Sequence, residues 1–173
     1  MAHLKKAAIA ALSLFALVGC ATSTPPAADP AADEAAIRAM GPAWFKAYNA
    51  GDVDGVAAQY ADDGVVNVPG AAAARGRAAI RESLAKDIAA TSAGGLTLTP
   101  ATTSEIGVSG DLGWEWNTFT VTDKSGATLD AGKYVTVYGR KDGKWLIIRD
   151  IWNSDTPPTP PTASTTGQTS TKN

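Results

Sequence analysis

Residues 111–153 read DLGWEWNTFTVTDKSGATLDAGKYVTVYGRKDGKWLIIRDIWN, and this stretch decides the fold. It contains three runs rich in β-branched and aromatic residues, which is typical of strands: Leu112–Thr122, Leu129–Arg140 and Trp145–Trp152. The segments Asp123-Lys124-Ser125-Gly126 and Lys141-Asp142-Gly143-Lys144 separate the runs, and the Gly in each can take the positive φ that a short hairpin needs. The stretch therefore predicts three antiparallel strands joined by tight turns.

Upstream, the turn Ser109-Gly110-Asp111 joins a fourth strand, a Thr-rich run at Leu96–Val108. Apolar residues recur at helical spacing in three earlier segments: Ile37, Met40, Trp44 and Tyr48; Val53, Val56 and Tyr60; and Ile80, Leu84 and Ile88. We expect the first helix to start at Asp33-Glu34 and to be kinked by Gly41-Pro42. With a short strand at Val65–Val68, the order predicts an α+β fold with helices on one face of a curved antiparallel sheet.

The first residues indicate export. Met1–Gly19 has a positive end and an apolar run too short to span a bilayer, which is typical of a signal peptide. The run ends at Leu17-Val18-Gly19-Cys20, which resembles the bacterial lipobox, and Cys20 is the only cysteine. We therefore predict a lipidated Cys20 that binds the membrane, in the cell envelope and at the outer membrane facing the periplasm. Residues 20–32 form the predicted tether, 33–154 the folded domain and 155–173 a disordered Pro/Thr/Ser tail.

Composition excludes several classes of chemistry. His3 is the only histidine, and it lies in the predicted signal peptide. Without His or a free thiol, the mature chain cannot perform Ser-His-Asp or Cys-His catalysis, thiol redox chemistry or His-based zinc binding. It has no basic run, so we expect no nucleic-acid partner. We expect no cofactor and no metal, since the adjacent Asp62-Asp63 alone would make a poor cation site.

Several motifs, in this order, resemble nuclear-transport-factor-2-like domains: Ala47–Asp52, Tyr60–Val66, Arg75-Gly76-Arg77 and Gly143–Asn153. The branch that they resemble is the SnoaL-like, ketosteroid-isomerase-homologue group of the domain-of-unknown-function-4440 type. The resemblance implies a cone-shaped antiparallel sheet wrapped around N-terminal helices, with an apolar pocket at its open end. It also implies a homodimer packed sheet to sheet. Isomerases, dehydratases, hydrolases and non-catalytic modules share this fold, so the fold names no activity.

The resemblance also argues against steroid isomerase activity. In ketosteroid isomerases of this fold, a Tyr on the first helix helps to hold the enolate oxygen, and an Asp just before a Pro is the general base. Here Trp44 falls near the Tyr position and Val68, before Pro69, falls at the base position. Neither side chain can transfer a proton, so we expect that constellation to be absent.

Asp150 is the first candidate for a polar group in the pocket. Strand alternation places it on one face with Trp152, Leu146 and Ile148. A functional Asp150 would accept hydrogen bonds from a ligand, or carry a pKa raised by burial. In a purely structural role, it would hold backbone N–H groups or pair with one of the basic residues Arg149, Arg140 and Lys133.

Glu115 is the second candidate, and alternation leaves its face open. If Glu115 and Asn117 point inward, they are the best polar pair of the cavity; otherwise Glu115 is solvated or pairs with Lys133. Tyr134 and Tyr138 share a face and would add phenols to either wall. The catalytic candidates are thus Asp150, Glu115 and Tyr134, and the ligand-binding candidates are Trp152, Asn117, Tyr138 and Trp44.

The last strand is apolar on both faces, which favours a dimer through the outer sheet face, with Trp145 on that exterior. Three functions remain. The first is an envelope lipoprotein module that binds a small apolar molecule in the cone. The second is an enzyme using carboxylate and Tyr acid-base chemistry for isomerisation, dehydration or hydrolysis. The third is a dimeric assembly module whose sheet surface is the working part.

Overall fold

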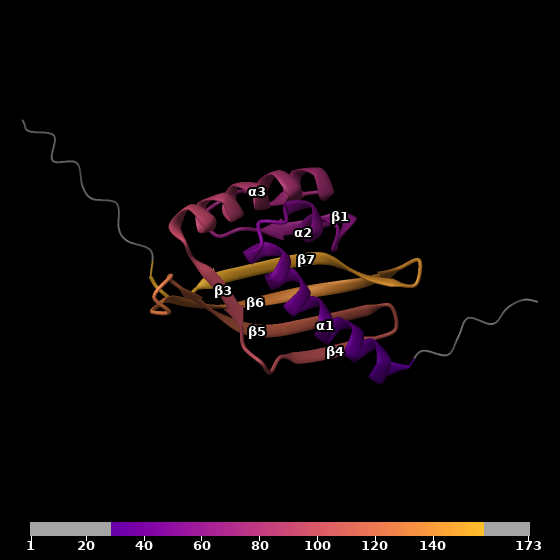
Figure 1. Cartoon of the computed structure of the whole chain (residues 1–173). Coiled ribbons are helices and arrows are strands. Elements are labelled where there is room, and N and C mark those ends of the chain that lie inside the picture. Colours follow the sequence, from indigo (N-terminus) through magenta and orange to yellow (C-terminus); the bar gives the residue numbers. More distant parts are fainter. Residues whose placement is uncertain (1–28, 158–173) are drawn as a thin grey trace, which may run out of the picture.

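The structure, a computed structural model, describes residues 29–157 (Figure 1). Three helices and seven strands follow in this order: α1 (Pro30–Asn49), α2 (Val53–Ala57), β1 (Tyr60–Asn67), β2 (Ala74–Arg75), α3 (Arg77–Gly94), β3 (Thr97–Pro100), β4 (Glu105–Ser109), β5 (Leu112–Thr122), β6 (Thr128–Lys141) and β7 (Lys144–Ser154). The predicted signal peptide, Cys20, most of the tether and most of the tail lie outside the described residues. Within residues 29–157, none of the helices has the length and apolar character needed to cross a membrane.

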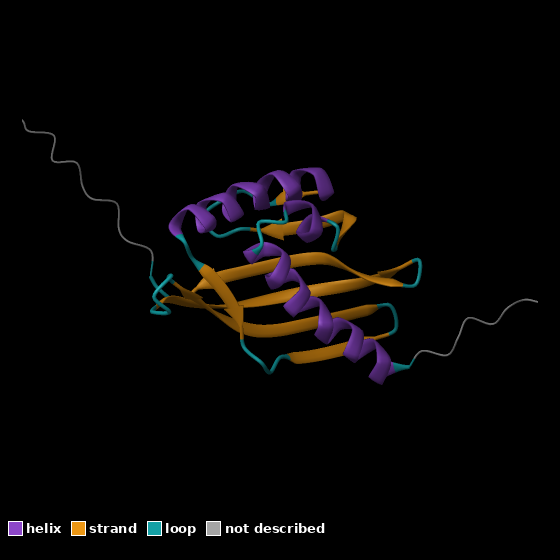
Figure 2. Cartoon of the chain, in the orientation of Figure 1, coloured by secondary structure: helices purple, strands orange, loops and turns teal. Residues whose placement is uncertain are grey.

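All seven strands form one sheet, in the order β2-β1-β7-β6-β5-β3, with β4 also paired to β5. The helices cover one face of this sheet, and α1 runs obliquely across it (Figures 1 and 2). This confirms the predicted α+β fold with a mostly antiparallel sheet. One pairing differs from the prediction: β1 is parallel to β7, with Val65 opposite Arg149. The chain reaches this position because α3 and five further strands, β2 to β6, separate β1 from β7 in the sequence.

The hairpin between β6 and β7 has the predicted turn chemistry. Lys141 pairs with Lys144, which leaves Asp142 and Gly143 as a two-residue loop. Their φ angles are 50° and 76°, as a type I′ turn requires. Asp142 is the only non-glycine residue with positive φ among those described. The turn fixes the register in which β6 and β7 present their side chains to the helices.

Helix α1 differs from its prediction at its start and its middle. It begins at Pro30, where the Asp29 side chain accepts hydrogen bonds from two backbone N–H groups, and it runs unbroken through Gly41-Pro42. Asp33 is instead buried, forms an ion pair with Arg140 and accepts a hydrogen bond from the Trp145 indole N–H at 3.3 Å. The hydrogen bond from Arg140 lowers the pKa of the Asp33 carboxyl. These contacts tie the N-terminal half of α1 to the sheet.

The predicted fourth strand is divided in two. β3 and β4 pair with successive halves of β5, and residues 101–104 interrupt them. Asn117 explains where the break lies, because its side-chain amide donates to the Ala101 carbonyl at 3.1 Å. Its side-chain oxygen accepts from the Thr118 backbone N–H at 2.8 Å. Asn117 therefore uses both ends of its amide to hold the edge of the sheet.

A bulge in β7 overturns the prediction for Trp145. Val137 pairs with Arg149 but Tyr138 pairs with Ile147, so Ile148 is an extra residue in β7. The bulge shifts the alternation by one residue, and Trp145, Ile147 and Asp150 all face the helices. Trp145 is only 9% exposed and belongs to the core, not to the sheet exterior. Periodicity read through the strand without the bulge put it on the wrong side.

Candidate functional site

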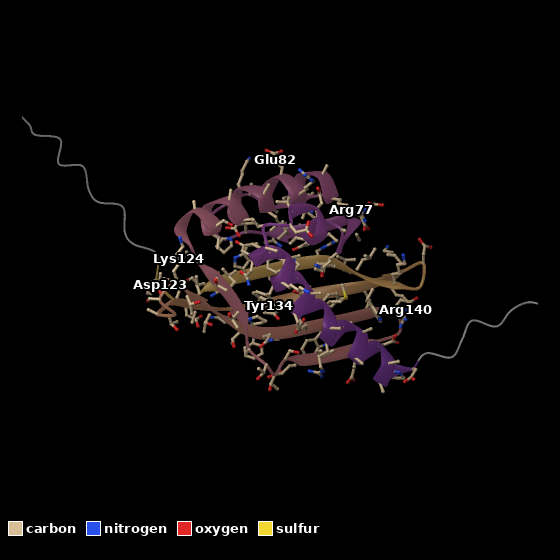
Figure 3. The ribbon with its side chains drawn as sticks, in the orientation of Figure 1. Arg77, Glu82, Asp123, Lys124, Tyr134 and Arg140 are labelled. Carbon is tan, nitrogen blue, oxygen red and sulfur yellow. The ribbon has the colours of Figure 1, made fainter. Side chains whose placement is uncertain are left out.

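A pocket of about 50 Å³ lies between α1, α3 and the inner face of the sheet. Twelve residues line it: Gly41, Trp44, Phe45, Asp87, Leu98, Phe119, Tyr134, Thr136, Tyr138, Ile147, Asp150 and Trp152. Tyr134 lies on β6 near the middle of the sheet, remote from the charged side chains Arg140 and Asp123 at its two ends (Figure 3). The lining is mostly aromatic and aliphatic, with carboxyl and hydroxyl groups as its polar part. Such a composition is typical of pockets for small molecules.

Asp150 is held in the pocket wall by two hydroxyl groups. The Tyr60 hydroxyl donates to one carboxyl oxygen at 2.6 Å, and the Thr136 hydroxyl donates to the other at 3.0 Å. The Trp44 indole N–H in turn donates to the Tyr60 oxygen at 3.2 Å, so α1 is joined to the network. No ion pair involves Asp150 within residues 29–157. The predicted pairing with Arg149, Arg140 or Lys133 is therefore absent there.

Burial controls the acidity of Asp150. The residue is 6% exposed, and desolvation raises the pKa of its carboxyl above the ordinary value of 3.8. The hydrogen bonds from Tyr60 and Thr136 oppose this rise, because they stabilise the charged form. Burial also raises the pKa of Tyr60, which shares a short hydrogen bond with Asp150. The pair is thus set toward protonation relative to the same groups in water.

We expect Asp150→Asn to change how stability depends on pH. Between pH 3.8 and the raised folded-state pKa, folded Asp150 holds a proton that the unfolded chain has lost, so stability falls as pH rises. An Asn side chain does not titrate, so the variant should lose this dependence of stability on pH. Its free energy of unfolding at pH 7 should rise by about 1.4 kcal/mol for each unit of pKa shift. Urea unfolding from pH 4 to 8 measures both effects.

The opposite-sign control for this experiment is Asp33→Asn. The folded-state pKa of Asp33 is lowered, so its contribution is present above its ordinary value of 3.8 and is lost as pH falls through the folded value. This variant should lose stability at neutral pH and flatten the acid limb of the profile. An Asp150→Asn profile that keeps the wild-type slope would contradict the assignment of that slope to Asp150.

Glu115 lies behind the pocket wall, 1% exposed, and its orientation resolves the question that alternation left open. It faces inward and accepts hydrogen bonds from the hydroxyls of Tyr138 at 2.9 Å and Tyr134 at 3.3 Å. Gly41 of α1 makes room for this cluster, since a Cβ there would lie 3.2–3.3 Å from the carboxyl and the Tyr134 oxygen. Register places Glu115, Thr136 and Asp150 side by side on three adjacent strands.

The structure brings most of the predicted site residues together. Five of them line the pocket: Trp44, Tyr134, Tyr138, Asp150 and Trp152. Glu115 and Asn117 are buried but are not among the lining residues; Glu115 sits behind the phenols and Asn117 holds the sheet edge. Val68, which the resemblance assigned to the position of the isomerase base, also lies outside the lining.

Sequence reasoning missed Asp87 and gave Tyr60 no partner. Asp87 lies on α3, lines the pocket, and accepts a hydrogen bond from the Tyr48 hydroxyl at 2.6 Å. Asp87 follows Leu84 by three residues, so it lies beside the apolar stripe of the helix. This spacing could have indicated that its carboxyl faces the sheet side of α3. Within the described residues, no group of three or more Asp, Glu, His or Cys side chains has the geometry of a metal site.

Comparison with known proteins gives a family and a fold. A family model described as SnoaL-like domain matches residues 42–148. No curated protein matches the chain.

Solved structures share the fold at low identity. An NTF2-like protein with a cystatin-like fold from Novosphingobium aromaticivorans is 22% identical, with a TM-score of 0.64 over 70% of this chain and 81% of that one. An NTF2-like protein of unknown function from Pseudomonas putida is also 22% identical, with a TM-score of 0.64 over 70% and 86%. A ketosteroid isomerase-like protein from Erwinia carotovora is 24% identical, with a TM-score of 0.57 over 72% and 98%.

Proposed function

The chain belongs to the SnoaL-like domain family, and we propose that it binds a small, largely apolar molecule in the pocket between α1, α3 and the sheet. The observation that carries this proposal is the lining. Rings such as Trp44, Phe119 and Trp152 surround a single deeply buried carboxyl, that of Asp150. Apolar walls supply affinity by burial, while one placed polar group fixes orientation.

The size of the pocket limits its occupant. An enclosed volume of about 150 Å³ accepts benzene, whereas this pocket encloses about 50 Å³. It therefore fits a molecule of only a few heavy atoms as it stands. Trp44, Leu98 and Trp152 are only half-buried, so a larger ligand would enter by moving these side chains.

Capture from a cell-envelope extract tests the proposal. Native mass spectrometry of the purified folded chain should detect a bound small molecule. Leu98→Trp, which places a larger ring in the pocket wall, should abolish the adduct. Leu129→Trp is the matched control, because Leu129 is 57% exposed and does not line the pocket. Absence of any adduct, or equal adducts with Leu98→Trp, would contradict binding in this pocket.

A second candidate function is acid-base catalysis, and the raised pKa of Asp150 is the observation that favours it. A buried carboxyl with a raised pKa is a group that can give a proton to a bound substrate or take one from it. Binding ranks first because the neighbouring hydroxyls of Tyr60 and Thr136 already donate to Asp150 and cannot also stabilise a developing oxyanion. Deuterium exchange into small ketones, lost in Asp150→Asn, would support catalysis; equal exchange in the variant would refute it.

We also propose that the outer sheet face forms a homodimer. Five large apolar residues on this face are each at least 38% exposed: Leu112, Trp114, Trp116, Val135 and Ile151. Register places Trp116, Val135 and Ile151 in one row across three strands. A contiguous apolar patch of this kind marks an interaction surface on a soluble domain. A sheet face can meet its own copy across a two-fold axis.

Trp116→Lys should convert this dimer to a monomer, because it places an unpaired charge at the centre of the patch. Sedimentation velocity measures the change. Ala79→Lys, on the exposed side of α3, adds the same charge to the helical layer and should leave the dimer intact. A wild-type chain that sediments as a monomer would refute the dimer.

The lipid anchor on Cys20 is a further part of the proposal. The apolar run followed by Gly19-Cys20 supports it. Diacylation plus an N-terminal acyl chain would hold the domain at the membrane, since a single chain binds only marginally. Cys20→Ser should therefore move the protein from the membrane fraction to the soluble periplasmic fraction. Retention of the variant at the membrane would contradict lipidation as the anchor.

A further inference from the structure

The pocket combines aromatic walls with carboxyl groups, and none of the residues between 29 and 157 that line it is basic. Six aromatic side chains line it: Trp44, Phe45, Phe119, Tyr134, Tyr138 and Trp152. Asp150 on β7 and Asp87 on α3 contribute carboxyl groups to the lining, and Glu115 lies behind the phenols of Tyr134 and Tyr138, to which it is hydrogen-bonded. Neither Lys nor Arg is among the lining residues, and no ion pair within residues 29–157 involves these three acids. The pocket therefore has acidic groups without a counter-charge of its own.

The hydrogen bonds around the pocket leave mainly acceptors for a ligand. Each carboxyl already accepts a hydrogen bond from at least one hydroxyl group. Asp150 accepts from Tyr60 and Thr136, Asp87 from Tyr48, and Glu115 from Tyr134 and Tyr138. A hydroxyl donates only one hydrogen bond but keeps lone pairs, and a carboxylate oxygen accepts more than one donor. The Trp44 N–H is also used, on the Tyr60 oxygen. A ligand that complements this pocket is therefore mainly a hydrogen-bond donor.

Charge and ring geometry select among donors. An anionic ligand would be repelled by the acids and would find few donors. A neutral alcohol could give one hydrogen bond. An ammonium group gives several hydrogen bonds, brings the missing positive charge, and is attracted to the faces of aromatic rings. Because burial makes an unpaired charge costly, only a cation seated against a carboxylate would recover its desolvation.

We propose that the pocket takes a small alkylammonium cation, with its N–H groups on the Asp150 carboxylate and its alkyl part against the rings of Trp44, Phe119 and Trp152. This inference rests on the proposed ligand-binding function and names its ligand class. The enclosed volume of about 50 Å³ sets the size at a few heavy atoms. Asp150 is the natural anchor because it is only 6% exposed yet belongs to the pocket wall.

Binding of this cation must compete with a proton. Burial raises the pKa of Asp150, so raising the pH ionises the carboxyl and should strengthen binding until the amine itself loses its proton. The titratable groups that act on Asp150 or share its pocket are Tyr60, Tyr134, Tyr138, Glu115 and Asp87. Burial raises the pKa of all three Tyr residues, so their phenols stay neutral over the working range.

Three probes with one small alkyl group test the inference. The ethylammonium ion, ethanol and propanoate share the ethyl group and differ in charge. Titration calorimetry with the folded chain at pH 7.5 should give the ammonium ion about tenfold or more tighter binding than the alcohol. Propanoate should not bind. The affinity for the ammonium ion, and not for the alcohol, should rise with pH as the Asp150 carboxyl ionises.

Variants locate the charge recognition. Asp150→Asn should weaken binding of the ammonium ion about tenfold and leave binding of the alcohol unchanged. Asp87→Asn removes the second carboxyl of the lining and should change the two affinities in the same direction as Asp150→Asn does. Glu82→Gln, exposed on α3 outside the pocket, is the control and should change neither affinity. If the alcohol binds as tightly as the ammonium ion, the cation inference is wrong while pocket binding stands. If none of the three probes binds wild-type protein, both proposals fail.

Discussion

Tyr138→Phe should lower the free energy of unfolding by about 2–3 kcal/mol, because it removes a hydroxyl that donates to a buried carboxyl. Tyr138 is 1% exposed and its hydroxyl lies 2.9 Å from Glu115, which is also 1% exposed. Glu115 would keep only the longer hydrogen bond from Tyr134, at 3.3 Å. Water cannot reach this depth to replace the lost donor, so the buried acceptor stays under-solvated and the free energy of unfolding falls by the full amount. Urea unfolding at pH 7 measures it.

A double-mutant cycle separates this cost from simple loss of packing. Glu115→Gln replaces one carboxyl oxygen with an amide NH₂ group, so Tyr138→Phe should cost at least about 1 kcal/mol less in that background. Tyr134→Phe is the matched control: its hydroxyl is farther from Glu115 and the residue is 8% exposed, so its loss should be smaller. Equal losses for the two Tyr variants, or additivity with Glu115→Gln, would contradict the role given to this hydrogen bond.

Local signals in the sequence predicted most of the architecture. Asp142-Gly143 set a two-residue turn, and the alternating residues of β5 separate an outer apolar set from an inner polar one. The apolar stripe of α3 predicted the buried residues Ile80, Leu84 and Ile88. Each of these features depends on residues close together in the chain, so periodicity and turn chemistry suffice to find them. The resemblance to nuclear-transport-factor-2-like domains supplied the way in which the elements assemble.

Features that depend on distant partners were missed. The bulge at Ile148 turns Trp145 inward, where its indole N–H meets Asp33 on α1, 112 residues earlier. No local pattern contains that contact. The continuity of α1 through Pro42 has a similar origin, because Ile37, Gly41 and Phe45, on both sides of the proline, are buried. Tertiary packing overrides local helix preference in such cases.

For the site, alternation identified Asp150 but not its partners. Tyr60 reaches it from a strand that runs parallel to β7, a pairing that the predicted all-antiparallel sheet did not contain. Glu115 could be assigned to a face only once the register of β5 was known. Single residues whose side chains could carry chemistry could therefore be identified from the sequence. The hydrogen-bond network that holds them comes from pairing between strands that are far apart in the chain.

Gly132→Ala should destabilise the domain by about 3 kcal/mol and close part of the pocket. A Cβ at position 132 would lie 2.4 Å from the backbone oxygen of Asn153 and 2.4 Å from Cζ of Phe119. The backbone of β7 cannot yield without disturbing its pairing with β6, so the Phe119 ring must also move. Phe119 lines the pocket and packs with Phe45 and Tyr134, so its displacement alters the binding site directly.

Gly139→Ala is the matched control on the same strand. Its Cβ would meet only side-chain atoms of Ile148, the nearest at 3.0 Å, and a small side-chain shift relieves the contact. We expect this variant to cost at most about 1 kcal/mol and to keep ligand capture by native mass spectrometry. Gly132→Ala should lose capture even at temperatures where circular dichroism shows it folded, because the pocket changes shape before the sheet unfolds. Unchanged stability and capture in Gly132→Ala would show that Phe119 has room to move away from the pocket, and the close packing described for this wall would be wrong.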